Sequence, residues 1–146
     1  LAGIIHDIGL IVENQVAGEQ LREACKAFRE GQGSLIECER KAIGADHAEV
    51  GYLLTKGWGL PQEVLSSIKS HHLSKQVKDV SSTGSILQLA EFMAGKMKYW
   101  PIAGPLEPLP PELTEHVMEK VADYKIVVRD LPGEMAKAKE LYESDE

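Results

Sequence analysis

The apolar residues of this chain recur at the spacing of α-helices, and this periodicity restricts the fold more than any other feature. Between Ala17 and Phe28 they fall at i, i+4, i+7 and i+8, which is one face of an amphipathic helix. No segment alternates apolar and polar residues over the length of a strand, and no Asn-Gly or Asp-Gly pair marks a hairpin. The sequence therefore predicts an all-α fold, a bundle of about six to seven helices.

Start and stop signals place the individual helices. We expect one apolar helix over 1–12, buried on most sides. Ser34 and Asp46 each precede a Glu by three residues, as in a capping box, and Pro61 suits the first turn of a helix that runs to His72. Polar residues over 75–82 predict a loop. Further helices are predicted over 86–97, 112–128 and 131–143.

The length of 146 residues fits one domain with a real core and is short for two. We expect a single domain over 1–146, with a motif-bearing core over 1–95, a Pro-rich connection over 96–111 and C-terminal helices over 112–146. The chain begins inside an apolar helix at Leu1 with no capping residue before it. We therefore expect an N-terminally truncated fragment of a longer protein.

The composition limits the classes of partner that the protein can bind. The net charge of −7 argues against a general nucleic-acid binder, yet a bound metal could still attract a small phosphorylated ligand. No apolar run reaches the roughly 18 residues of a membrane span, and no signal peptide is present. Cys25 and Cys38 show no disulfide or metal spacing and are expected to be free thiols. These features predict a cytoplasmic protein without a membrane or nucleic-acid partner.

The histidines are the residues that can carry chemistry. His6 adjoins Asp7, His71 adjoins His72, and His47 begins a helix between the two pairs. Imidazole and carboxylate ligands together suit Mn, Fe, Zn or Ni. Adjacent helical residues point about 100° apart, so His6 and Asp7 can form one wall of a pocket, with Asp7 bridging two ions, but cannot chelate like an i, i+4 pair. By spacing alone, a surface or hydrogen-bonded core role remains the commoner one for any single histidine.

Several segments in order resemble the HD superfamily. Residues 1–9 (LAGIIHDIG) resemble the HD motif helix, and residues 44–54 (GADHAEVGYLL) are similar to the second motif. Residues 58–61 (WGLP), followed by residues 68–72 (IKSHH), resemble the third. Leu89-Ala90-Glu91 stands where the family commonly has Ala-Asp. The combination most resembles the HDOD subfamily of bacterial signalling proteins, related to the HD-GYP phosphodiesterases and the HD metal-dependent phosphohydrolases, over residues 1 to about 95.

The resemblance implies a helical bundle around a metal-site cavity that holds one or two divalent transition-metal ions. The positions that match metal ligands of the relatives are His6, Asp7, His47, His71, His72 and Glu91.

Two departures from the family pattern concern catalysis. Leu10 replaces the lysine that normally follows HDIG, which removes a cation that would meet a phosphate. The Gly-Tyr-Pro segment of the HD-GYP enzymes is missing after His72.

Three functions remain open. The first is a signalling or regulatory domain that retains a metal pocket and acts through other domains of its parent protein, with a phosphorylated small molecule as a possible ligand. The second is an active metal-dependent phosphohydrolase or phosphodiesterase on nucleotides, cyclic dinucleotides or phosphate esters, in which Asp7 would be catalytic through its metal. The third is a purely structural interaction module.

Overall fold

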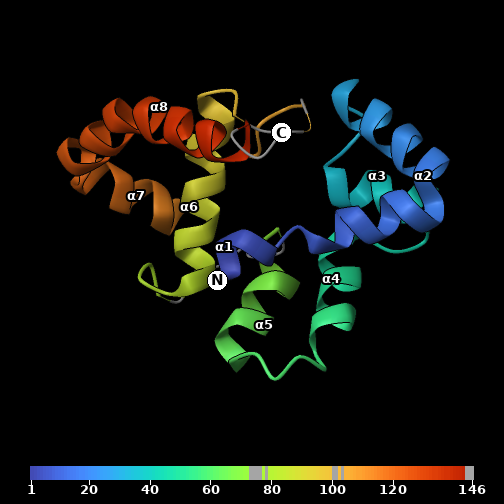
Figure 1. The fold of residues 1–146 in the computed structure, drawn as a ribbon. Helices are drawn as coiled ribbons and strands as arrows, with labels where there is room; N and C mark the ends of the chain where they lie inside the picture. The colour runs from blue at the N-terminus through green and yellow to red at the C-terminus, as the bar shows by residue number, and fades with distance from the viewer. Residues whose placement is uncertain (73–76, 78, 100–101, 103, 144–146) are drawn as a thin grey trace.

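A computed structural model gives the fold of the chain and describes residues 1–72, 77, 79–99, 102 and 104–143. Figure 1 shows helices joined by connections of varied length, with long ones on either side of α6. The predicted all-α class is confirmed, and the described ranges contain no strand. The elements are α1 (Ala2–Ile5), α2 (Ile8–Arg29), α3 (Leu35–Ala42), α4 (His47–Thr55), α5 (Gln62–Ser70), α6 (Thr83–Lys96), α7 (Pro111–Glu119) and α8 (Val121–Glu143).

The helices pack in a chain of neighbours around the short α1. Helix α2 lies against both α3 and α4, α4 packs on α5, and α5 packs on α6. Helix α1 touches α5 and α6, and Figure 1 shows it near the middle of the molecule. This arrangement brings the start of α2, the start of α4, the end of α5 and the middle of α6 toward α1. None of the described helices is both long and apolar enough to cross a membrane.

One hydrophobic cluster joins α2 to α3. Ala24 and Phe28 of α2 are almost fully buried against Leu35 and Cys38 of α3. The Pro-rich connection is tied to the same cluster, because a Cβ at Gly104 would lie 2.1 Å from the Phe28 ring. This contact leaves no room for a side chain and holds the connection against α2. Cys25 and Cys38 are both free.

The N-terminal segment differs from the expected helix over 1–12. Helix α1 ends at Ile5, and the chain turns through His6 and Asp7 before α2 begins. Asp7 has φ −93° and ψ 12°, outside regular helix geometry. The segment is also less buried than expected, because Ile4 is 86% exposed and Ile11 is 59% exposed. The apolar residues of this segment correctly predicted helix. They did not predict the turn at His6 and Asp7, which divides the segment into two helices.

Helix boundaries elsewhere follow local backbone chemistry. Ser34 and Glu37 form the predicted reciprocal capping box, and Asp46 accepts a hydrogen bond from the Glu49 N–H. The expected break near 129–130 is wrong, because Lys120 ends α7 and α8 continues through Pro132. Part of the expected loop over 75–82 (75–76 and 78) lies outside the described residues.

Candidate metal centre

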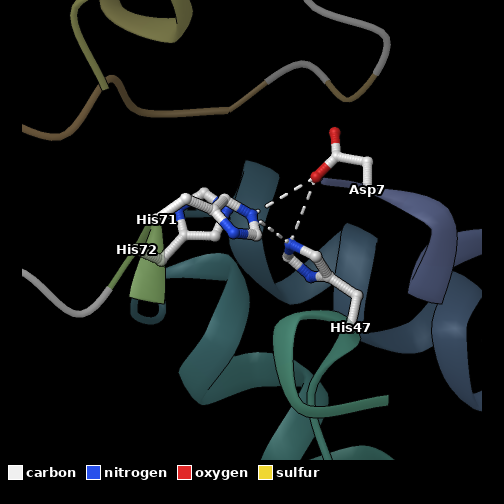
Figure 2. A group of neighbouring side chains, drawn as sticks. All are labelled: Asp7, His47, His71 and His72. Carbon is white, nitrogen blue, oxygen red and sulfur yellow. Dashed lines mark hydrogen bonds and ion pairs between the residues drawn. The ribbon is translucent and has the colours of Figure 1, made fainter. Parts of the chain in front are cut away.

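Three side chains, from the ends of three helices, converge on one point. The Oδ1 atom of Asp7 lies 3.5 Å from His47 Nε2 and 3.4 Å from His71 Nε2. The two imidazole nitrogens are themselves 3.3 Å apart. Figure 2 shows one Asp7 oxygen directed at both rings and the other directed away. The three atoms form a nearly equilateral triangle.

The tautomers make this triangle a set of acceptors. His71 Nδ1 lies 2.8 Å from the carbonyl oxygen of Ile68, which can only accept, so this nitrogen carries the proton. His47 Nδ1 lies 2.7 Å from Glu39 Oε2, and it donates to that carboxylate. Each ring therefore turns the lone pair of its Nε2 toward the other and toward Asp7. Such a cluster is stable only with a proton or a cation at its centre.

The separations fit a transition-metal ion. Metal–nitrogen and metal–oxygen bonds of roughly 2.1 Å in tetrahedral geometry place neighbouring ligand atoms roughly 3.4 Å apart. The three distances between Asp7, His47 and His71, of 3.3 to 3.5 Å, match that value. The donor set of imidazole and carboxylate is also the one such ions prefer.

A fourth residue completes this group. His72 stands beside His71 with ring centroids 4.2 Å apart, and His47 lies 5.0 Å from the His72 ring. Burial, together with the neighbouring His71 and His47, lowers the pKa of His72 to about 2. A neutral imidazole is the form that ligates metal. One ligand atom from each of Asp7, His47, His71 and His72 lies within 4.8 Å of all the others.

A second group shares two members with the first. His6 Nε2 lies 2.9 Å from Glu91 Oε1 and 3.3 Å from Asp7 Oδ2. Together with His71, these residues again place one ligand atom each within 4.8 Å of one another. The two Asp7 oxygens thus face different groups, Oδ1 toward His47 and Oδ2 toward His6. Asp7 and His71 are common to both.

His6 is held with both ring nitrogens against acceptors. Its Nδ1 donates to the Gly3 carbonyl at 3.0 Å, while its Nε2 faces Glu91 and Asp7. Burial opposes the charged form, but hydrogen bonds to Asp7 and then Glu91 raise the pKa of His6 to about 10. Burial likewise opposes charge on Asp7, but the hydrogen bond from His6 and the contact with His71 hold the pKa of that carboxyl well below its usual range. Asp7 is therefore an anion that already attracts cations.

Two glycines bring Asp7 against His47. A Cβ at Gly9 would lie 1.9 Å from the carbonyl oxygen of His47 and 2.9 Å from the backbone nitrogen of Gly51. The first turn of α2 therefore rests backbone to backbone on α4, which only a residue without a side chain allows. Asp7 stands two residues before Gly9, so this close approach sets its distance to His47.

A buried carboxylate that sequence analysis did not predict orients His47. Glu39 of α3 is fully buried, bonds His47 Nδ1 and also accepts from the His47 backbone N–H at 3.1 Å. Burial alone would lower the pKa of His47. The hydrogen bond to Glu39 and the charge of that carboxylate raise it, and the net shift of the pKa is upward. A carboxylate behind a ligating imidazole fixes its tautomer and raises its basicity. Glu39 belongs to a short polar helix segment in the sequence, where a Glu ordinarily faces solvent.

Glu13 is the second buried acid that sequence reasoning missed. It is only 1% exposed, and neither carboxylate oxygen has a hydrogen-bond partner. Burial, and then the charge of Glu39, raises the pKa of Glu13 to about 8. It occupies the apolar face of α2 between Gly9 and Leu21, and a search for charged residues at apolar helix positions could have found it.

The six ligand candidates of the sequence all meet in this region, in two groups that overlap at Asp7 and His71. His6 and Asp7 come from the turn between α1 and α2, His47 from the start of α4, and His71 and His72 from the end of α5; Glu91 belongs to α6. Whether these side chains bind an ion stays a prediction.

The comparisons with known proteins agree with the fold and with the arrangement of motifs. A family model described as the HDOD domain matches residues 1–74, just over half of the chain. Comparisons with curated proteins and with solved structures gave no match. The matched range includes five of the six ligand candidates, all but Glu91. The chain belongs to the HDOD family.

Proposed function

We propose that this protein is a regulatory HDOD signalling domain that binds divalent transition metal in the cluster around Asp7. The observation that carries the proposal is the triangle of Asp7 Oδ1, His47 Nε2 and His71 Nε2, with sides of 3.3 to 3.5 Å. Three acceptors at these separations repel one another unless a positive charge lies between them. A metal ion supplies that charge and matches the ligand types.

The cluster has enough ligand atoms for two ions. One would be held by Asp7 Oδ1, His47, His71 and His72, and the other by Asp7 Oδ2, His6 and Glu91. Asp7 would then bridge them through its two oxygens. Mn, Fe, Ni and Zn all suit this mixture of imidazole and carboxylate.

Regulation is the preferred role because the site is poor in groups that handle phosphate. Leu10, in the first turn of α2, is half-buried and apolar where the family pattern has lysine. A missing cation removes stabilisation of developing negative charge, often worth a few kcal/mol in a dry site. On this reading the metal holds α1, α4 and α5 together, and the signal passes to other domains of the parent protein in the cytoplasm.

A metal-dependent phosphohydrolase is the second candidate, and one observation favours it. A cavity of about 360 Å³ borders the cluster and is lined in part by His71, His72 and Glu91. A small phosphorylated molecule in this cavity would lie beside the metal ligands. A bound ion supplies an activated water and a clamp for phosphate oxygens. Asp7 would then hold the ion beside the substrate.

A turnover assay separates the two functions. The purified chain, loaded with Mn or Fe, is tested on a panel of nucleotides, cyclic dinucleotides and simple phosphate esters. The regulatory proposal predicts metal binding without turnover above the rate of an Asp7→Ala variant. Turnover that Asp7→Ala abolishes, and that an exposed control such as Asp123→Asn retains, would establish the enzyme instead.

A further inference from the structure

Glu91 joins the metal cluster to the second half of the chain. The other five ligand candidates all precede the connection between α5 and α6, and Glu91 alone of the six lies in α6. Its Oε1 atom is 2.9 Å from His6 Nε2, and the two side chains are only 14% and 15% exposed. A hydrogen bond between an acid and an imidazole is stronger than a neutral one, and shielding from water preserves that strength. The cluster therefore holds α6 against the helices that precede it.

A second contact holds the beginning of α6. The Thr83 N–H donates to Glu63 Oε1 of α5 at 3.3 Å, and the Thr83 hydroxyl donates to the same oxygen. A Cβ on the next residue, Gly84, would lie 3.8 Å from Ser67 Oγ, so α5 and α6 are in ordinary contact at this end. Glu63 is exposed, and water can replace its hydrogen bonds. This contact therefore positions the start of α6 without fixing it rigidly.

The two contacts lie at separate points along one helix. Glu91 stands eight residues after Thr83, which is about 12 Å further along α6. Helix α6 also packs on α5 and touches α1, so loss of the Glu91 contact would loosen the helix rather than detach it. After α6 the chain continues into α7 and α8, which pack on each other (Figure 1). A change in the hold on α6 would thus reach the C-terminal helices.

We propose that Glu91 is a latch, a side chain through which the state of the metal cluster determines how firmly α6 is held against α1 and α5. In the metal-free chain the latch is the contact with His6. An ion held by the group of His6, Asp7, His71 and Glu91 would bind the Glu91 carboxylate and hold α6 more firmly. The inference deepens the proposed function by naming how its site regulates, and it rests on that function only for the metal-bound state.

Hydrogen–deuterium exchange of the full chain, followed by mass spectrometry, measures how firmly each helix is held. In the metal-free protein we expect Glu91→Ala and His6→Asn each to speed exchange of the α6 amides about tenfold, the effect of losing about 1.4 kcal/mol. The amides of α2 and α3 should be unaffected. The double variant should exchange within about twofold of either single variant, because both substitutions remove the same contact. Ile86→Ala, at an exposed position of α6, is the control and should match the wild type.

Three results in the metal-free protein would overturn the latch, whether or not the chain binds metal. The first is exchange of α6 within about twofold of the wild type in both single variants. The second is a double variant whose effect is the product of the two single effects, since His6 and Glu91 would then act separately. The third is an equal increase in α2 and α3, which would indicate a general loss of stability.

Addition of excess Zn tests the metal-bound state. The latch predicts that exchange of the α6 amides slows at least about tenfold in the wild type and does not slow in Glu91→Ala. Slower exchange in α4 and α5 of the wild type without any change in α6 would support metal binding and overturn the coupling to α6. If the chain takes up no Zn while the metal-free variants behave as expected, the latch is supported and the proposed function alone fails.

Discussion

The first turn of α2 lies against α4 so closely that a Cβ on Gly9 would stand 1.9 Å from the carbonyl oxygen of His47. This contact joins the turn that carries Asp7 to the helix that carries His47. The family motif places a glycine two residues after its aspartate, and here the reason is steric. The separation of the two ligand candidates depends on that missing side chain.

Gly9→Ala should therefore damage the cluster and the fold together. The added methyl forces α2 and α4 apart, and overpacking of this kind typically costs about 1–3 kcal/mol. Urea unfolding followed by circular dichroism gives the stability, and a metal titration gives the affinity. Gly3→Ala is the matched control, because a Cβ at Gly3 meets nothing within 4 Å. Equal stability and affinity in the two variants would contradict the steric role of Gly9.

Glu39→Gln should weaken metal binding while the fold remains. The amide can still accept from His47 Nδ1 but loses the negative charge that makes the imidazole more basic, so we expect a loss of about 10- to 100-fold in affinity. Isothermal titration calorimetry with Zn or Mn measures it. Glu49→Gln, exposed on the first turn of α4, is the control. The orienting role of Glu39 is wrong if the two variants bind alike.

Glu13→Met should stabilise the protein, and increasingly so as the pH rises. The pKa of Glu13 is raised from 4.5 to about 8 in the folded chain. Below pH 4.5 the Glu13 carboxyl is protonated in both the folded and the unfolded chain, so its ionisation does not lower the free energy of unfolding. Between the two values the unfolded state releases the proton while the folded state keeps it, so the penalty grows with pH, and above about 8 it is constant.

The measurement for Glu13 is urea unfolding of the metal-free protein at several pH values. The difference between Glu13→Met and the parent chain should increase from acid to mildly alkaline pH, by roughly a few kcal/mol at most. Groups far from Glu13 cancel in this difference because both chains carry them, while His47, whose pKa the charge of Glu13 helps to raise, also contributes to it. A difference that does not change with pH would show that Glu13 ionises as readily in the folded chain as in the unfolded one.

Metal affinity should rise with pH up to mildly alkaline conditions. The pKa of His6 is raised to about 10, so at neutral pH a metal must displace a proton from its imidazolium. Calorimetry in buffers of different ionisation enthalpy counts the released protons, and we expect about one from His6 for the ion that it binds. His6→Asn should abolish that release, while His116→Asn on α7 should not. Unchanged proton release in His6→Asn would exclude His6 from the site.

The sequence predicted the helical class and the meeting of the histidines, for different reasons. Apolar spacing and the Ser34 capping box depend only on neighbouring residues, so they can be recognised without knowledge of the fold. The prediction that His6, His47 and His71 meet came from the family motifs. Spacing alone did not support it, because a single histidine more often has a surface or hydrogen-bonded core role. The triangle of distances is a tertiary result of the Gly9 contact.

The two buried acids differ in how far the sequence could have indicated them. Glu39 resembles an ordinary helix surface residue until α2, α3 and α4 are packed together, because its burial depends on the partner helices. Glu13 stands at an apolar position of α2, where a charged residue could have been noticed. The turn at His6 and Asp7 was hidden by the apolar residues on both sides. The expected break at 129–130 was wrong, because α8 continues from Val121 to Glu143 and includes Pro132.

The most direct test of the metal proposal is the metal content of the purified chain after reconstitution. The chain is incubated with Mn, Fe, Ni or Zn, dialysed against metal-free buffer and measured by inductively coupled plasma mass spectrometry. We predict between one and two ions per wild-type chain for at least one of these metals, and a near-complete loss in Asp7→Ala with the control Asp123→Asn unaffected. A wild-type chain that is folded yet retains none of the four metals would contradict the proposal.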